Sequence, residues 1–157
     1  MAGQFLSNVE YEHFSSFPKE IIEQDLITYF TLSSSDKVQI PIQSSGANRL
    51  GFAVQLCALR YLGFSPTNLT NIPPVIATYI SNQLELTAEV LREYAQRSQT
   101  RTEHLKKIQK YLGFRDISED DLQHLSKWLT DRALEHDKPI LLFQLAREKL
   151  LQNKIIR

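Results

Sequence analysis

The stretch from Ala47 to Leu62 most constrains how this chain can fold. Within it, the charged or amide side chains are those of Asn48, Arg49, Gln55 and Arg60. A helix that is apolar on nearly every side belongs at the centre of a core. Gly63 directly follows and supplies a stop at the helix C-terminus. We therefore expect the rest of the chain to pack around one buried central helix.

Helical periodicity continues along the chain, and no convincing alternating strand is visible. Helix starts are marked by Ser-x-x-Glu or Thr-x-x-Glu capping boxes, by serine caps and by prolines suited to a first helical turn. The expected helices are Ser7–Phe14, Lys19–Phe30, a short one between Ser33 and Pro41, Ala47–Leu62, Pro73–Leu84, Thr87–Arg97, Arg101–Leu112 with a Thr100–Glu103 capping box, one that Ser118 caps, and Pro139–Arg157. Leu105, Ile108 and Leu112 are expected to line one side of their helix, and Leu122, Leu125, Leu129 and Ala133 to face inward on the helix that Ser118 caps. The predicted fold is an all-α bundle of about nine short helices with helix-turn-helix-like pairs. Ser65–Pro74 is the expected joint between possible lobes 1–66 and 67–157.

Composition favours a folded protein without a membrane segment. Hydrophobic residues make up 42% and charged residues 23% of the chain, which is ordinary globular usage. The single cysteine, Cys57, excludes an intramolecular disulfide framework and suits a reducing compartment; its apolar helix indicates a buried, inert thiol. No apolar stretch approaches the ~20 residues that span a bilayer, and no signal peptide is visible. We expect a cytoplasmic protein with no membrane partner.

Charge is balanced overall but arranged in blocks. Residues 1–36 sum to −5, residues 92–115 to +5, residues 116–137 to −5 and residues 138–157 to +4. Blocks of this size can give a neutral molecule a face of one sign. The 92–115 block is a candidate site for a polyanion, and an alternative reading is a set of solvated helix faces.

Motifs for catalysis or metal binding are missing from the sequence. The four histidines form neither an HExxH pattern nor a pair with a CxxC motif, and no glycine-rich phosphate loop is present. The sequence predicts no catalytic residue, no metal site and no cofactor. The opposing hypothesis is an enzyme that uses the scattered histidine and aspartate side chains.

Residues 87–112 have helix-turn-helix proportions: a helix Thr87–Arg97, a turn Ser98–Thr100 and a basic helix Arg101–Leu112. Such a motif brings the start of its second helix to the DNA major groove, where Arg101 would read guanine and Gln99 adenine. The candidate groove contacts are Gln99, Thr100, Arg101, Thr102 and His104. The candidate backbone contacts are Arg92, Arg97, Lys106, Lys107, Lys110 and Arg115, with an apolar or phosphate contact from Tyr111.

Several blocks of the sequence also resemble a known family. Asn48–Cys57 reads NRLGFAVQLC and continues to RYLG at Arg60–Gly63, which closely resembles class II (Tn-three family) replicative transposases. The chain is similar to that family in further blocks that occur in the same order: FLS from Phe5, YFTL from Tyr29, Ile72-Pro73, Tyr79-Ile80, Gln83-Leu84, Tyr94, TRTEH from Thr100, Ile108 and Gly113-Phe114.

The resemblance implies the amino-terminal, all-helical region of a much longer transposase. In that family this region binds the terminal inverted repeats of the transposon, and a metal-dependent acidic triad lies in a catalytic domain absent from this chain. The implied partners are double-stranded DNA, the remaining transposase domains and a second copy through the full-length protein, with nucleoid association when DNA is bound. Asn48 and Arg49 match the family pattern as further DNA-binding candidates, although Arg49 could equally pair with Asp25 or Glu23. The alternative function is a helical protein-interaction or dimerisation module with little DNA specificity.

Overall fold

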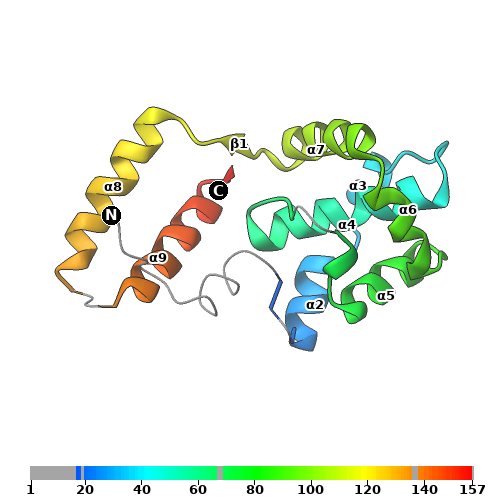
Figure 1. Ribbon diagram of the computed structural model, residues 1–157, viewed down its shortest axis with the longest axis horizontal. Coiled ribbons are helices and arrows are strands. Elements are labelled where there is room, and N and C mark those ends of the chain that lie inside the picture. Colours follow the sequence, from blue (N-terminus) through cyan, green and yellow to red (C-terminus); the bar gives the residue numbers. More distant parts are fainter. Residues whose placement is uncertain (1–16, 19, 67–68, 136–137, 157) are drawn as a thin grey trace.

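A computed structural model describes residues 17–18, 20–66, 69–135 and 138–156 of the chain (Figure 1). In order, its elements are α2 (Glu23–Phe30), α3 (Ser34–Gln39), α4 (Gly46–Leu62), the 3-10 turn η1 (Leu69–Asn71), α5 (Pro74–Gln83), the 3-10 turn η2 (Ala88–Val90), α6 (Leu91–Ala95), α7 (Ser98–Leu112), β1 (Arg115–Asp116), α8 (Glu119–Ala133), α9 (Pro139–Gln152) and β2 (Ile155–Ile156). The all-α class predicted from the sequence is confirmed. The expected helix Ser7–Phe14 lies outside the described residues.

Helix α4 forms the centre of the core, as expected. Every residue from Leu50 to Leu59 is buried, and α2, α5, α6 and α7 all pack against the helix. The Ser45 side chain caps its start by accepting a hydrogen bond from the Asn48 amide at 3.2 Å. Gly63 ends it with a left-handed φ of 79°, a conformation that glycine adopts without steric cost. The free thiol of Cys57 is fully buried, and burial raises its pKa to about 12.

Local signals mark the starts of α3, α5, α8 and α9. Ser33 and Asp36 form a reciprocal capping box that starts α3, and Ser118 and Asp121 form another that starts α8. Each box pairs two amides that a helix start otherwise leaves without partners. Pro74 occupies the first turn of α5 and Pro139 the first turn of α9. These starts agree with the sequence expectation to within a residue.

The described elements form a helical body and a projecting hairpin (Figure 1). Helices α2 to α7 build the body, and α8 and α9 lie side by side as the hairpin. Strands β1 and β2 join the hairpin base by a parallel pairing of Arg115 with Ile155 and Asp116 with Ile156. Gly63, at the end of α4, lies against Leu151 of α9. The C-terminal part of α9 is thus tied to the body.

Two expectations about α7 and its neighbour are wrong. Helix α7 begins at Ser98 because the Arg101 amide bonds to the Arg97 carbonyl at 2.9 Å, so residues 98–100 are helical and not a turn. The expected Thr100–Glu103 capping box therefore lies inside the helix. The expected helix Thr87–Arg97 is divided into η2 and a short α6 that ends at Ala95.

The C-terminal expectations also need correction. Helix α9 ends at Gln152, because Lys154 adopts a left-handed φ of 54° and its carbonyl accepts the Arg115 amide at 3.0 Å. The last residues pair as β2 and do not continue the helix. On α8, Leu122 and Ala133 were expected to face inward but are exposed, since no described element covers that part of the helix.

The possible division into lobes 1–66 and 67–157 stays a prediction. In the structure α4 packs against α6 and α7, which lie beyond residue 66 in the sequence. The Ser65–Pro74 stretch includes η1, whose Leu69 is fully buried, and η1 packs against α6.

Gly51→Ala tests the closest helix contact in the core. A Cβ atom at Gly51 would lie 2.1 Å from the Tyr94 ring, so the substitution must displace α6 from α4. We expect a loss of about 1–3 kcal/mol in the free energy of unfolding, the usual cost of overpacking. Urea denaturation followed by circular dichroism measures it. Gly46→Ala, whose Cβ would meet only the end of the Leu86 side chain at 3.1 Å, is the matched control and should stay within about 1 kcal/mol of the unmodified chain.

Candidate nucleic-acid interface

Helix α7 has one face in the core and one in solvent. Ile108 is fully buried, and Leu105 and Leu112 pack against the same core, as the sequence predicted. The opposite face exposes polar and basic side chains: Gln99, Thr102, Glu103, Lys106, Lys107 and Lys110. This set is called the outer face of α7 below.

The family-like segments of α4 and α7 meet in one interface. The Tyr94 ring lies directly on Gly51, where only a glycine leaves room for it. Buried Gln55, one turn further along α4, donates its amide to the Tyr94 hydroxyl at 2.5 Å and to the Arg101 carbonyl at 3.2 Å. The Ser65 hydroxyl donates to the Gln55 carbonyl at 3.2 Å. This network, called the Gln55 network below, ties α4, α6 and α7 together inside the protein.

His104 points into this interface and not toward solvent. Because Gln55 donates to the Tyr94 hydroxyl, that hydroxyl can donate its own proton to His104 Nδ1, 2.8 Å away. The His104 ring stacks on Tyr94, and Phe52 meets it edge-on. Burial lowers the pKa of His104, nearby Lys107 lowers it further, and Glu103 acts in the opposite direction. The neutral imidazole is thus the form that fits the fold.

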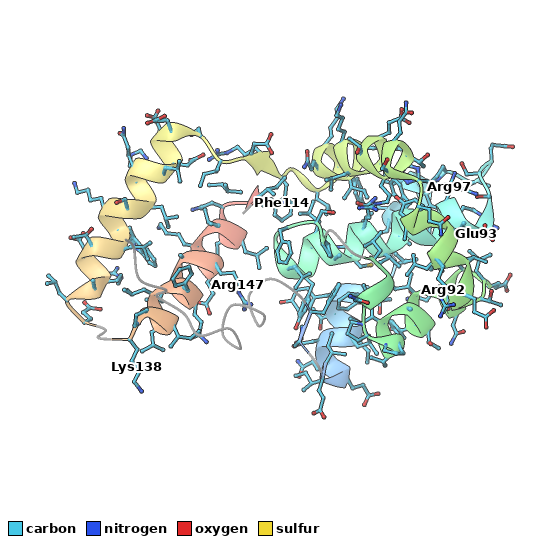
Figure 2. The ribbon with its side chains drawn as sticks, in the orientation of Figure 1. Arg92, Glu93, Arg97, Phe114, Lys138 and Arg147 are labelled. Atoms are coloured by element: carbon cyan, nitrogen blue, oxygen red, sulfur yellow. The ribbon has the colours of Figure 1, made fainter. Side chains whose placement is uncertain are left out.

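The two arginines at the α6–α7 turn bind protein atoms. Arg101 donates to the Ala95 carbonyl at 2.8 Å, which satisfies an acceptor at the end of α6. Arg97 donates to Asn48 Oδ1 at 2.8 Å and to the Ser45 hydroxyl at 3.2 Å, and its guanidinium lies 3.9 Å from a Glu93 carboxylate oxygen. Arg97 remains exposed, at the end of the body where Figure 2 also labels Arg92. Arg101 therefore positions the turn, and Arg97 combines a structural contact with an accessible charge.

A second buried cluster fixes α3 against α4 and α7. Asp36, which is 2% exposed, accepts hydrogen bonds from Arg60 at 2.7 Å, from the Tyr111 hydroxyl at 2.8 Å and from the Ser33 amide at 3.0 Å. Burial raises the pKa of Asp36, but these donors outweigh burial and hold the pKa below its usual value. Tyr111 is thereby used inside the protein. The Asp36 charge is also neutralised by Arg60 and does not oppose the lysines of α7.

Lys107 links α7 to α3 from the surface. Its ammonium donates to the Gln39 carbonyl at 2.9 Å and lies 5.5 Å from the Phe52 ring centroid. Arg115, at the other end of α7, forms a bidentate pair with Asp121. The Arg115 charge is therefore largely matched within the protein, whereas Lys106 and Lys110 stay exposed on the outer face.

Arg49 lies at a different place from the outer face. It lines a pocket of about 380 Å³ together with Lys37, Asn82 and Glu85. Its Nε atom is buried without a hydrogen-bond partner among the described residues. The expected alternative, an ion pair with Glu23 or Asp25, is not found in the described part of the chain.

Apart from Arg49, which lines its own pocket, the structure divides the sequence-predicted residues into two groups. Those accessible to a ligand are Arg92, Arg97, Gln99, Thr102, Lys106, Lys107 and Lys110. Those mainly engaged within the protein are Asn48, Arg101, His104, Tyr111 and Arg115; Thr100 is half-buried. Sequence reasoning did not assign roles to Gln55, Asp36 and Arg60. The sequence did contain a signal for Gln55 and Arg60, because an isolated amide or guanidinium in an otherwise apolar helix needs a buried partner.

The described residues offer neither a metal site nor a membrane-spanning helix. No group of three His, Cys, Asp or Glu side chains there could hold a metal ion. None of the described helices is both long and apolar enough to cross a membrane.

Comparison with known proteins identifies the family. A family model described as Domain of unknown function (DUF4158) matches residues 5–157. The chain belongs to this family. It is also 35% identical over 134 residues to the transposase for transposon Tn501 of Pseudomonas aeruginosa, an alignment that covers 85% of the chain and 14% of that protein.

Two further relatives extend the similarity to nearly the whole chain. The transposase for transposon Tn1546 of Enterococcus faecium is 35% identical over 98% of the chain and 15% of the relative. The transposase for transposon gamma-delta of Escherichia coli (strain K12) is 33% identical over 99% of the chain and 16% of the relative. The resemblance to this transposase family is confirmed. The chain spans about one sixth or less of the length of the relatives it matches.

The pH dependence of stability tests the inward position of His104. Its folded pKa lies below the ordinary value of 6.5, so the unfolded chain binds the proton more readily. The stabilising contribution is therefore complete above about pH 6.5 and is lost as the pH falls through the folded pKa. Urea midpoints at pH 7.5 and pH 5 should show a smaller loss for His104→Asn, which lacks this titration, than for the unmodified chain. His124→Asn, on exposed α8, should behave like the unmodified chain; equal losses in all three proteins would contradict the assignment.

Proposed function

We propose that this chain is the DNA-binding module of a transposase and recognises the terminal inverted repeats of its transposon. It would thereby position a catalytic domain located elsewhere in the full protein. The observation that carries the proposal is the outer face of α7, where Lys106 and Lys110 are exposed beside Gln99 and Thr102 on a helix held rigidly by the core. The names of the relatives, transposases for transposons, support DNA as the ligand.

Charge supports a nucleic-acid ligand for this face. The nearby carboxylates Asp36 and Asp121 are paired with Arg60 and Arg115, so they do not cancel the α7 lysines. Glu103, the acid on the outer face of α7, is outnumbered there by Lys106, Lys107 and Lys110. Arg92 and Arg97 extend the accessible positive charge beyond the start of the helix. Lysines spaced three to four residues apart on one helix face can follow a phosphate backbone, and such contacts set position without reading sequence.

Sequence reading is proposed for the first turns of α7. Gln99 can pair with an adenine edge, and Thr102 can hydrogen-bond to a base or contact a thymine methyl group. In this proposal α6 and α7 act as a helix-turn-helix-like pair, with α7 in the major groove. Arg101 and His104 act through the helix position and not through the bases, because their side chains bond to Ala95 and Tyr94.

The same proposal implies where the protein acts and which step other domains carry out. The protein would act on DNA in the bacterial cytoplasm, associated with the nucleoid when bound. The chemistry of transposition, with its metal requirement, would belong to other domains of a longer protein. This module itself would be non-catalytic.

Fluorescence anisotropy tests the proposal directly. The chain is titrated with a duplex that carries the inverted repeat flanking its own gene and with a shuffled duplex of equal composition, across a salt series. Tighter binding to the repeat that persists at moderate salt is the expected result. Equal affinity for both duplexes would remove sequence recognition from this chain, and no binding at low salt would refute the proposal.

Replacement of two lysines tests the phosphate contacts. Lys106→Ala with Lys110→Ala should weaken both duplexes about equally and flatten the slope of log affinity against log salt by about 1.8, since each phosphate contact contributes about 0.9. The control is Lys127→Ala on acidic α8, which should leave affinity and slope unchanged. Unchanged binding by the double variant would rule out the outer face of α7.

Gln99→Ala tests base reading. We expect a loss of about 1–3 kcal/mol of binding free energy for the repeat and little change for the shuffled duplex. Competition titrations with single base-pair replacements should locate the lost preference at one step of the repeat. An equal loss on both duplexes would show that Gln99 contacts the backbone.

A further inference from the structure

The segment between α3 and α4 exposes an apolar side chain at the tip of a tight turn. Ile42 is 75% exposed, and the turn around it closes when the Ser44 amide donates to the Pro41 carbonyl at 3.0 Å. Ile40, just before the turn, is buried in the core, and Ser45, just after it, caps α4. The Pro41–Ser44 turn is therefore a preformed projection, and a preformed surface lowers the ordering cost of association.

Two cations that neighbour or belong to α7 hold this turn from both sides. Lys107, on the outer face of α7, donates to the Gln39 carbonyl before the turn at 2.9 Å. Arg97, which directly precedes α7, donates to the Ser45 hydroxyl after the turn at 3.2 Å. The turn thus lies beside α7 and borders its outer face, and Figure 1 shows α3 and the loop after it next to the start of α7.

A pocket with excess positive charge adjoins the tip of the turn. Ile42 lines the pocket of about 380 Å³ that also holds Lys37, Arg49 and Glu85. Among the described residues, no acceptor bonds to the buried Nε atom of Arg49. Residues 37–49 contain two bases and no acid, and Glu85 is the one carboxylate among the residues that line the pocket. The pocket therefore suits an anion more than a cation.

We propose that the Pro41–Ser44 turn enters the minor groove beside the major groove that α7 occupies, and that Ile42 inserts between two base pairs and bends the duplex. This inference rests on the proposed function and adds a contact that reads DNA shape. Some DNA-binding proteins place a helix in the major groove and an adjacent segment in the next minor groove. Proteins that kink DNA from the minor groove insert apolar side chains such as isoleucine, accompanied by basic or amide side chains.

The residues around Ile42 match the rest of such a contact. Gln43, its neighbour at the tip of the turn, can donate to the adenine N3 or thymine O2 atoms that line the minor groove at A·T pairs. A backbone phosphate beside the kink would enter the pocket and accept hydrogen bonds from Arg49 and Lys37. Kinking costs least at a pyrimidine–purine step, so we expect the contact to select such a step in the repeat.

The chemistry of the turn favours DNA over a protein partner. The core of a protein interface is a contiguous apolar surface depleted in charge. Ile42 instead projects singly, with Gln43 beside it and Lys37 and Arg49 in the pocket that it lines.

Fluorescence resonance energy transfer between dyes at the two ends of the inverted-repeat duplex tests the bend, with the complete 157-residue chain as the protein. The unmodified chain should shorten the distance between the dyes relative to the free duplex. Ile42→Ser should bind with the dye distance of the free duplex, because the wedge is lost. The matched control is Leu134→Ser, an apolar side chain that is 90% exposed on the α8–α9 hairpin; it should leave the bend unchanged. Substitutions of exposed side chains generally preserve the fold, and circular dichroism checks the helix content of both variants.

The fluorescent adenine analogue aminopurine locates the wedge, because its emission rises when the base is unstacked. Placed at successive adenines of the repeat, it should brighten at one step with the unmodified chain and stay dim with Ile42→Ser. Specific binding of the repeat without a bend or a rise in emission would overturn this inference and leave the proposed function intact. A bend that persists in Ile42→Ser would also overturn it. Equal affinity for the repeat and the shuffled duplex would overturn both.

Lys37→Gln tests the phosphate in the pocket. It should flatten the slope of log affinity against log salt by about 0.9 on the repeat, whereas Lys127→Gln on α8 should leave the slope unchanged. An unchanged slope in Lys37→Gln would exclude a phosphate contact from the pocket and overturn that part of the proposal.

Discussion

The contact between Gly51 and the Tyr94 ring sets how α6 and the start of α7 lie on α4. It brings α6 so close to the central helix that the Tyr94 hydroxyl reaches Gln55 and His104. The Gln55 amide then binds the Arg101 carbonyl, which fixes the start of α7. A buried amide with good hydrogen-bond partners fixes the relative position of the helices, because any shift of the helices would leave polar atoms unpaired in the core. Together with the bond from Tyr111 to Asp36, this packing sets the direction in which α7 displays its lysines.

The residues that carry the family resemblance therefore serve mainly to hold the helices together. Gly51, Gln55 and Arg60 of α4 bind or admit residues of α6, α7 and α3, and the TRTEH segment supplies two of the side chains that complete the interface. The exposed lysines Lys106 and Lys110 lie outside that segment, whereas Thr102, which is also exposed, lies within it. This division is physically reasonable, since the helix that presents a binding face needs the same rigid support whatever sequence its face reads.

Much of the fold could be predicted because its signals are local. Ser33, Ser118, Gly63 and Pro74 mark helix ends through contacts with residues a few positions away, and the apolar run of α4 needs no partner to be recognised as core. The orientations of Arg101 and His104 could not be predicted, because they depend on Gln55 and Tyr94, which belong to other elements. The two-residue strands are too short for any periodicity to reveal. Exposure of Leu122 was missed for a similar reason: an apolar stripe shows that a helix has a packing face but does not say whether this chain supplies the partner.

The parallel pairing of β1 and β2 has a mechanical consequence. Because Arg115 is hydrogen-bonded to the residue that precedes Ile155, the chain enters and leaves the hairpin at adjacent points. Tension applied at β2 would pass across the pairing into β1 and then to the Gly113 end of α7, without stretching α8 or α9. The α8–α9 hairpin thus lies outside the route by which force passes from β2 to α7. A molecule that binds the hairpin could push or pull on it, and the force that reaches α7 would still depend on the β1–β2 pairing.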